Sequence, residues 1–368
     1  MDPNIKAIKI CFIAPKAYPL LNQDIKEVFG GAEVDLYFLA TELAKDENFD
    51  VSFITADYGQ EKIETIEGIK VIKSVDFQKN ALNGTIRFWQ ALRKAEAEMY
   101  MIKTISPGMF LLALFCRLKK KAFLYRTSNT NDCDGTYLGQ HPVLGRIYKW
   151  ALRTAKIVFV QNNTDKDDLK RTASVASVVI PNGHRLKQLT ENKRNTILWI
   201  GRSAQIKKPE LFVKLAQEMP AEQFTMICQQ ATGDNKYEQL TAEAENLENL
   251  EFIERIGFDE IDSYFQRAKV FVNTSEAEGF PNTFIQACMF ATPILSLNVN
   301  PDGFLDKYNC GICCGNDFNK LVESLKLMLK ESRYKQTGIN ARKYVQQQHD
   351  IKNVVEEYKE LFLRLAEK

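Results

Sequence analysis

The pattern of hydrophobic residues changes repeatedly between two periods along the chain. Short apolar runs rich in β-branched residues indicate buried strands, and longer segments with an apolar residue every three to four positions indicate helices. The predicted strands span residues 8–14, 51–56, 69–71, 100–102, 122–125, 157–161, 177–180, 197–200, 224–228, 250–253, 270–272 and 294–297. The predicted helices span residues 32–45, 86–99, 109–118, 143–154, 165–171, 209–217, 237–245, 259–268, 283–291, 319–330, 332–349 and 354–365. This alternation is typical of parallel α/β sheets.

A turn at Pro181-Asn182-Gly183 divides the alternation into two halves. The polar stretch 184–196 follows with little periodicity, and the alternation begins again at residue 197. A chain of 368 residues is also long for one hydrophobic core. We therefore expect two doubly wound domains with a cleft between them, residues 1–183 and 184–349. We expect the C-terminal helix, about residues 350–368, to pack back on the first domain.

The composition is that of an ordinary globular protein, with 45% hydrophobic and 26% charged residues. The net charge of +2 argues against a nucleic-acid-binding protein. No signal peptide is recognisable, and the longest apolar run, 109–116, is much shorter than the roughly 20 residues that span a bilayer. The sequence therefore predicts a cytoplasmic protein.

The cysteine and histidine pattern does not favour a metal site. The chain has eight cysteines, most of them in apolar runs, and only three histidines. Cys310 and Cys313 form a C-x-x-C pair, but no second pair with suitable spacing exists, whereas zinc takes about four ligands. We expect free thiols in a buried strand, in a reducing compartment, and no metal site.

The first candidate site follows the predicted strand 270–272. The loop after it contains two carboxylates, Glu276 and Glu278. The next helix is entered at Pro281-Asn282, and Asn282 is the expected N-cap. Loops at the carboxyl ends of strands are where open α/β sheets bind ligands.

A second candidate site follows the predicted strand 197–200. Gly201 is expected to let the backbone turn, Arg202 and Lys207 follow in the loop, and Pro209 is the expected first residue of the next helix. Arginine gives forked hydrogen bonds and lysine a compact charge, so the pair could neutralise a diphosphate. The alternative is a solvated basic loop.

A third candidate site is the pair Gly30-Gly31, which precedes the predicted helix 32–45. Paired glycines permit close approach to the backbone, and a helix start offers free N–H groups to an anion. The alternative is a tight turn without a ligand.

The order of these motifs resembles that of the retaining glycosyltransferases of GT-B fold, family 4, also called glycosyl transferases group 1. The resemblance extends over nearly the whole chain and is strongest over residues 179–297. The acidic motif of that family is Glu, seven residues, then Glu. Glu278 matches the first position, and Gln286 occupies the second.

The resemblance implies two Rossmann-like domains and a UDP- or GDP-linked sugar donor held mainly by the C-terminal domain. It implies that Glu278 is the catalytic residue beside the donor sugar. Arg202 and Lys207 would hold the diphosphate in place of a metal ion, so no cofactor is expected. Gln286 would bind the ribose hydroxyls through its amide. The other donor-binding residues that it implies are Gly30, Gly31, Gly279, Phe280, Pro281, Asn282 and Thr283.

The acceptor side departs from the family. Many members have a histidine in the N-terminal domain where this chain, over residues 125–135, has none. Asn129 and Asp132 are the candidates to contact the acceptor there. Because these residue types favour turns, a hydrogen-bonded turn is the alternative. His141 and His184 are interpreted as structural.

Residues 77–126 are strongly basic, with Glu96 and Glu98 as their only acidic residues. The basic residues are Lys79, Arg87, Arg93, Lys94, Lys103, Arg117, Lys119, Lys120, Lys121 and Arg126. Basic amphipathic surfaces bind anionic lipid head groups, so peripheral contact with a membrane is one hypothesis. Solvated helix faces above an ordinary core are the alternative.

The sequence thus predicts an enzyme that transfers a hexose, with retention, from a nucleotide sugar to a saccharide or lipid-linked saccharide. Synthesis of cell-surface polysaccharide or lipopolysaccharide, at the inner face of the plasma membrane, is the expected setting. A catalytically silent nucleotide-sugar-binding protein is one alternative, because Gln286 replaces a carboxylate and the histidine is missing. A GT-B sugar-nucleotide epimerase is another, although histidines for acid/base work are scarce.

Overall fold

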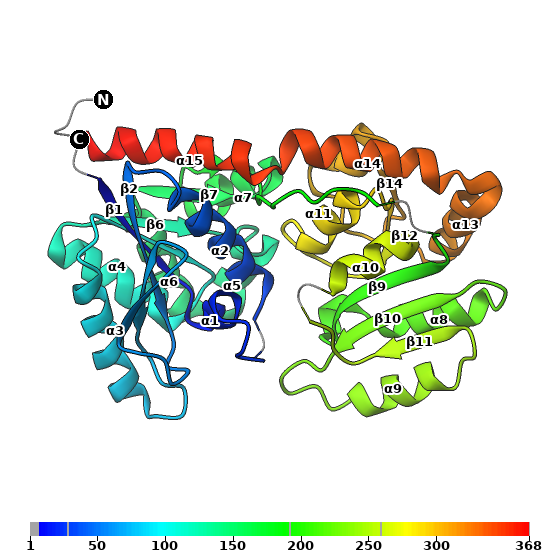
Figure 1. Ribbon diagram of the computed structural model, residues 1–368, viewed down its shortest axis with the longest axis horizontal. Coiled ribbons are helices and arrows are strands. Elements are labelled where there is room, and N and C mark those ends of the chain that lie inside the picture. Colours follow the sequence, from blue (N-terminus) through cyan, green and yellow to red (C-terminus); the bar gives the residue numbers. More distant parts are fainter. Residues whose placement is uncertain (1–6, 28, 191–192, 258–259, 368) are drawn as a thin grey trace. The chain divides into compact units, whose positions relative to one another are not determined.

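The computed structural model describes residues 7–27, 29–190, 193–257 and 260–367 (Figure 1). The chain forms two compact units: the first runs to Arg185 and resumes at Asp350, and the second is Leu186–His349. This division after Arg185 lies two residues from the boundary expected after residue 183. Arg185 belongs to the first unit, where its Nη2 donates to Thr41 Oγ1 at 2.7 Å.

The first unit is built on one eight-stranded sheet. Its strands are β1 (Ile8–Ile13), β2 (Phe49–Thr55), β3 (Ile63–Ile66), β4 (Ile69–Lys73), β5 (Met99–Lys103), β6 (Ala122–Arg126), β7 (Ile157–Val160) and β8 (Val178–Val179). They lie in the order β3-β4-β2-β1-β5-β6-β7-β8, and every pair is parallel except β3 with β4. The strand order therefore reverses at β1 and β5, which makes their carboxyl ends the switch point of this sheet.

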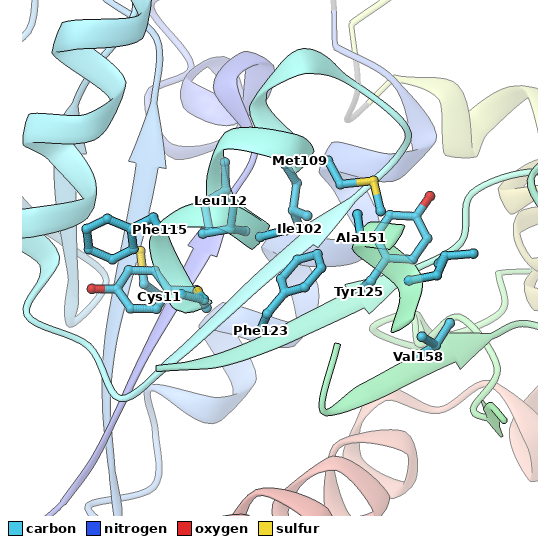
Figure 2. Close-up of a cluster of buried hydrophobic side chains, with 14 of the residues drawn as sticks. Cys11, Ile102, Met109, Leu112, Phe115, Phe123, Tyr125, Ala151 and Val158 are labelled. Atoms are coloured by element: carbon cyan, nitrogen blue, oxygen red, sulfur yellow. The ribbon is translucent and has the colours of Figure 1, made fainter. Parts of the chain in front are cut away.

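Helices cover both faces of this sheet. They are α1 (Tyr18–Leu21), α2 (Gly31–Leu43), α3 (Ala81–Ala95), α4 (Pro107–Lys119), α5 (Thr136–Gln140), α6 (Pro142–Thr154), α7 (Asn163–Ala173) and α15 (Ile351–Ala366). On one face α3, α4 and α6 bury their apolar sides in a common core. Figure 2 shows part of this core, with Met109 of α4 and Ala151 of α6 close to Tyr125 of β6.

The C-terminal helix α15 belongs to the first unit and packs with α2 and β1. The Phe362 ring lies edge-on to Phe49 of β2 at 6.3 Å, and the Tyr358 ring lies 5.0 Å from Phe159 of β7. Both side chains are almost completely buried. The last helix of the chain thus completes a core that the first strands begin.

The second unit is a six-stranded parallel sheet in the order β11-β10-β9-β12-β13-β14. Its strands are β9 (Thr196–Arg202), β10 (Phe224–Gln229), β11 (Leu250–Ile253), β12 (Ala268–Asn273), β13 (Ile294–Ser296) and β14 (Gly311–Cys313). Its helices are α8 (Glu210–Glu218), α9 (Tyr237–Glu245), α10 (Ile261–Arg267), α11 (Asn282–Met289), α12 (Phe304–Lys307), α13 (Phe318–Leu329) and α14 (Tyr334–Gln348). The order reverses between β9 and β12, which is the switch point of this sheet.

Some element boundaries differ from those predicted. The helix expected over 86–99 is α3, which begins at Ala81 because the Asn80 side chain caps it by accepting from the N–H of Asn83 at 2.9 Å. It ends at Ala95, because the C-cap residue Glu96 has a left-handed φ of 51°, and Met99 lies in β5. The expected starting residue of helix 259–268, Asp259, and the last residue of the chain lie outside the described residues.

The structure contains elements that the pattern did not predict, among them the short helices α1 and α12, the strand β3 and the helix α5. β3 is an edge strand with Ile63 exposed, and α5 has no buried residue, so neither has a clear apolar period. All eight cysteines are free thiols, and Cys310 to Cys314 surround the short strand β14.

Candidate functional site

Two candidate motifs lie at the switch point of the second sheet. β9 and β12 are neighbours; β9 ends at Arg202, and β12 ends at Asn273. The loop after β9 carries Lys207 at the end of a single 3-10 turn, Gln205–Lys207, and the loop after β12 carries Glu278. Lys207 and Glu278 are 71 positions apart in the chain, and they lie at one edge of one sheet because both strands are parallel and adjacent.

Several polar contacts join the two loops. Lys207 Nζ lies 2.6 Å from Glu278 Oε2 in an ion pair. Thr274 Oγ1 donates to the Lys207 carbonyl at 2.7 Å, and the N–H of Glu276 donates to the carbonyl of Ile206 at 2.8 Å. The position of each loop thus depends on the other, and the lysine and the glutamate face one another.

The Glu278 carboxylate is held from both sides. Its Oε1 accepts from Ser275 Oγ at 2.6 Å and from Asn273 Nδ2 at 3.1 Å, and both donors belong to buried residues. An ionised carboxylate can only accept hydrogen bonds, so these two donors and the Lys207 ammonium orient it and stabilise its charge. Its neighbour Glu276 is exposed and lies 3.6 Å from Lys208, an ion pair at the surface.

Arg202 is exposed at the end of β9, and its guanidinium has no partner within the described part of the chain. The glycine before it has a different role from the one predicted. Gly201 lies inside β9 and has no left-handed φ. A Cβ at this position would stand 2.7 Å from the Trp199 ring, so the residue is small because the indole needs the space. That indole donates from Nε1 to Thr274 Oγ1 at 2.9 Å.

Helix α11 begins directly after the Glu278 loop. Its N-cap is Pro281 rather than the expected Asn282, which is the first helical residue, and Thr283 follows it half-buried. Helix α8 differs in the same way, because Pro209 is its N-cap and not its first residue. A proline with φ near −63° has no N–H to lose at a helix start, which suits it to this place.

Two side chains beside this helix start are buried. The ring of Phe280, which follows Gly279, lies 4.7 Å from the His349 ring and 5.1 Å from the Phe304 ring. Gln286 is in α11 and is largely buried, and no donor or acceptor among the described residues contacts its amide. The amide can therefore both donate to and accept from a ligand.

Gly30 and Gly31 lie at the start of α2 in the first unit. Gly30 is the N-cap, and its N–H donates to Glu33 Oε2 at 2.9 Å in a capping box. Neither glycine has a left-handed φ. The pair is therefore at a helix start, as predicted, but an anion that used the Gly30 N–H would displace the Glu33 carboxylate.

Asn129 and Asp132 form a hydrogen-bonded 3-10 turn (Thr130–Asp132) after β6. Asp132 Oδ2 accepts from the N–H of Ser128 at 2.9 Å and from the N–H of Asn129 at 3.2 Å. The Asn129 side chain accepts from the N–H of Asn131. Burial raises the pKa of Asp132, against these hydrogen bonds, which lower it. The two candidates thus organise the turn, which corresponds to the alternative interpretation.

The sequence did not reveal a buried ionic cluster in the first unit. Asp35 Oδ2, from α2, accepts from Lys103 Nζ at 2.8 Å and from Arg126 Nε at 2.6 Å. Arg126 Nη2 also donates to Asn182 Oδ1 at 2.6 Å, and Nη1 to the Tyr358 hydroxyl at 2.6 Å. The interpretation of Lys103 and Arg126 as part of a basic surface over residues 77–126 is wrong, because both side chains are buried.

This cluster places α2 against the sheet. Lys103 and Arg126 end adjacent strands, β5 and β6, where they pair in register. Asp35 lies one turn into α2, so its two ion pairs fix the helix that starts at the two glycines. The burial of Lys103 lowers its pKa to about 8, although the neighbouring Asp35 raises it. Nearby Arg126 and Lys103 hold the pKa of Asp35 below its usual value, overcoming its burial.

The two α/β units are typical of two-domain glycosyltransferases, and comparisons with known proteins give the same class. The family described as "Glycosyltransferase Family 4" matches residues 29–188, and the family described as "Glycosyl transferases group 1" matches residues 183–344. Between them the two matches extend over both units. The chain belongs to the group 1 glycosyltransferases of GT-B fold.

Relatives and solved structures are similar over almost the whole chain. An uncharacterized glycosyltransferase of Haemophilus influenzae is 21% identical over 90% of this chain and 95% of its own. A sucrose-phosphate synthase structure from Thermosynechococcus elongatus covers 97% of this chain and 98% of its own, at 18% identity and a TM-score of 0.79. A trehalose-6-phosphate protein of E. coli bound with UDP-2-fluoro glucose covers 96% and 98%, at 11% identity and a TM-score of 0.70.

Within the described residues, no group of three or more His, Cys, Asp or Glu side chains is placed to hold a metal ion. None of the described helices combines the length and the hydropathy that crossing a bilayer requires.

Proposed function

We propose that this glycosyltransferase moves a sugar, with retention and without a metal ion, from a nucleotide sugar to a saccharide or lipid-linked saccharide. The observation that carries the proposal is the Lys207–Glu278 pair at the switch point of the second sheet. Ligands of open α/β sheets bind at such points. A cation and a carboxylate there match the two charges that develop when a glycosyl–diphosphate bond breaks.

In this proposal the donor diphosphate takes the cations of the site. Arg202 is exposed and unpaired in the described chain, so it is available for a forked bond to phosphate. Lys207 is held by Glu278 and exchanges that carboxylate for a phosphate when the donor binds. Glu278 stays oriented by Ser275 and Asn273 and turns its charge toward the sugar. Donor binding would thus place the acid at the sugar.

The transfer then needs no separate metal or base. The bond between the anomeric carbon and the diphosphate oxygen breaks, and the acceptor oxygen bonds to that carbon on the same face. The acceptor proton passes to a donor phosphate oxygen, and nucleoside diphosphate leaves. The two cations oppose the negative charge on the leaving group, and Glu278 opposes the positive charge on the sugar.

The remaining donor contacts follow from the same geometry. We assign the ribose to Gln286, whose amide can both donate to and accept from hydroxyls. The backbone from Gly279 to Asn282, with Thr283, would contact the sugar and phosphate at the start of α11. Gly30 and Gly31, at the start of α2, are proposed as further donor-binding residues. The E. coli neighbour's UDP-2-fluoro glucose supports a nucleotide-sugar donor and favours UDP as the first base to test.

The acceptor and the setting are proposed on the first unit. Asn129 and Asp132 would act through the turn that they organise, and the acceptor would be a saccharide, free or on a lipid carrier. We place the enzyme in the cytoplasm, in peripheral contact with the membrane, in cell-surface polysaccharide synthesis. Gln286 stands where the family motif has a glutamate. This replacement favours one other candidate function, that of a catalytically silent nucleotide-sugar-binding protein.

Calorimetry with nucleoside diphosphate tests the phosphate clamp. Arg202→Ala and Lys207→Ala should each weaken binding about 10- to 100-fold, the loss of one charge-assisted hydrogen bond of about 1.5–3 kcal/mol. The matched control is Lys208→Ala, because this lysine lies in the same loop and pairs with Glu276 instead. An unchanged dissociation constant for both clamp variants would remove the clamp.

Release of nucleoside diphosphate that depends on both donor and acceptor tests catalysis. Glu278→Gln should abolish it while nucleoside diphosphate binds no more weakly, because the substitution releases Lys207 from its ion pair. Glu276→Gln, in the same loop, should leave turnover unchanged. Transfer should survive chelation of divalent metal by EDTA. Turnover that persists in Glu278→Gln, or that needs metal, contradicts the proposal; donor binding without any transfer favours the silent protein.

A further inference from the structure

Exposed apolar side chains gather on one side of the first unit. Of the thirteen large hydrophobic residues exposed in the described chain, eight lie on α3, α4 and α6 or just before α3. They are Phe77, Leu82, Ile86, Leu114, Leu118, Val143, Leu144 and Ile147. Leu82 and Val143 are among the most exposed, at 72% and 71%. Single exposed apolar residues are ordinary, but a concentration on neighbouring helices marks a binding surface.

These eight residues belong to one surface, which we call the three-helix surface. Helix α4 packs against α3 on one side and α6 on the other. All three helices bury their opposite sides in the same core, and Figure 2 shows side chains of α4 and α6 in it. On α3, Leu82, Ile86 and Arg93 are spaced four and seven residues apart, so they project from one face of the helix.

The charges of this surface have a single sign. Helices α3, α4 and α6 carry three, two and three Lys or Arg residues and no Asp or Glu, whereas the whole chain has 49 basic and 47 acidic residues. Five of these cations are exposed and have no ion-pair partner in the described chain, namely Arg93, Lys94, Arg117, Lys119 and Arg146. Arg87 instead pairs with Asp57 at 3.2 Å.

We infer that the three-helix surface docks on an anionic lipid bilayer. Its leucine, valine and isoleucine side chains would enter the boundary between head groups and acyl chains, and its unpaired cations would meet the lipid phosphates. A nucleic acid would use the cations but would leave the aliphatic side chains in water. The excess of cations, without one carboxylate on the three helices, fits a surface of uniform negative charge.

The surface also adjoins the proposed acceptor side. Helix α6 follows the Asn129–Asp132 turn through the short helix α5. The Tyr148 hydroxyl of α6 donates to the Asp132 carbonyl at 2.9 Å, so the docking helix holds that turn. Given the proposed function, the acceptor class is therefore a saccharide on a membrane-embedded lipid. Its reacting sugar would stand just above the head groups, next to α6.

Vesicle flotation of the full chain tests this inference. The protein should float with phosphatidylcholine vesicles that contain phosphatidylglycerol, and binding should fall as salt is raised. Pure phosphatidylcholine should bind it much less. Replacing Arg93, Lys94 and Arg117 by Gln should lower the partition coefficient about 100-fold, at about 1 kcal/mol for each cation. Absence of salt-sensitive flotation overturns the inference.

The apolar contribution needs its own variant and control. Val143→Ser with Leu144→Ser and Ile147→Ser should lower partitioning at least tenfold. The control, Leu327→Ser with Ile339→Ser, removes exposed apolar residues of the second unit and should change nothing. Equal losses in both variants would overturn the inference. So would a short DNA duplex that competes fully with the vesicles, since that would make the surface a general polyanion site.

The outcome can be separated from that of the proposed function. The three-helix variants should keep the wild-type affinity for nucleoside diphosphate and the wild-type turnover on a water-soluble acceptor. They should lose turnover only on an acceptor embedded in vesicles. Vesicle binding without any sugar transfer would contradict the proposed function and leave the docking surface standing; transfer without vesicle binding would do the reverse.

Discussion

The buried cluster around Asp35 allows a sharp stability prediction. Asp35→Asn keeps the size of the side chain but removes the only carboxylate that contacts Lys103 and Arg126 in the described structure. The Lys103 and Arg126 side chains are 3% and 0% exposed, so two cations would remain in the core without their anion. Removing one partner of a buried pair costs about 3–5 kcal/mol, because the remaining charge stays desolvated. We expect Asp35→Asn to lose that amount of unfolding free energy.

Glu42→Gln is the matched control, because it lies on the same helix and makes an ion pair of similar length. Its Oε2 is 2.6 Å from Lys45 Nζ, but the lysine side chain is 61% exposed. Such a surface pair contributes about 0.3–0.5 kcal/mol. Urea unfolding followed by tryptophan fluorescence and circular dichroism measures both variants. A loss below about 1 kcal/mol for Asp35→Asn, equal to the control, would refute the account of a buried, obligatory anion.

The pH dependence of this variant is a second measurement on the same proteins. The Lys103 pKa is about 8 in the folded chain, below the value of about 10.4 expected when unfolded. Between these values the unfolded state binds more protons, so wild-type stability from this group rises with pH. Without Asp35 the folded pKa falls further and the rise begins at lower pH. The deficit of Asp35→Asn should therefore shrink between pH 6 and pH 9; a deficit that grows would contradict this sign.

Three further predictions concern stability. Burial raises the pKa of Asp165 from 3.8 to about 7, so the folded state loses stability as pH rises between these values. Asp165→Asn should remove this loss, which is up to about 4 kcal/mol. Unfolding free energies in urea that change equally with pH in the wild type and the variant, from pH 4 to 8, would contradict this. Gly201→Ala should displace the Trp199 ring and cost about 1–3 kcal/mol, seen as a lower Tm and a changed tryptophan emission. Tyr358→Phe removes an acceptor of Arg126 and should cost about 1–3 kcal/mol by urea unfolding; no change would mean that water replaces it.

Local patterns predicted most of the fold because strands and helices of an α/β sheet carry their own periods. The family resemblance assigns the loops after β9 and β12 to one donor-binding site. In the structure Lys207 Nζ lies 2.6 Å from Glu278 Oε2. Parallel strands end at one edge of a sheet, so two motifs after such strands can meet without any contact being visible in the sequence. The family resemblance added the register that distinguishes Glu278 from Glu276.

The sequence could not indicate which charged side chains are buried. Lys103 and Arg126 look like surface cations in a basic stretch, because their partner Asp35 is 68 and 91 positions away. The reason for Gly201 was also hidden, since the indole that needs its space lies two residues earlier on the same strand. At Pro281-Asn282 either residue type can stand at a helix start, and only the backbone angles decide between them.

The division of the first unit between the two ends of the chain has a consequence for how the protein is made. Synthesis proceeds at about 5–20 residues per second, so the 183 residues after Arg185 take roughly 10–40 s. During that time the first unit lacks α15, and Arg126 lacks the Tyr358 hydroxyl. The continuous segment Leu186–His349 emerges complete before it. The unit begun first at the ribosome is thus closed last, and chains cut short before residue 351 would expose Phe49 and Phe159 to chaperones and proteases.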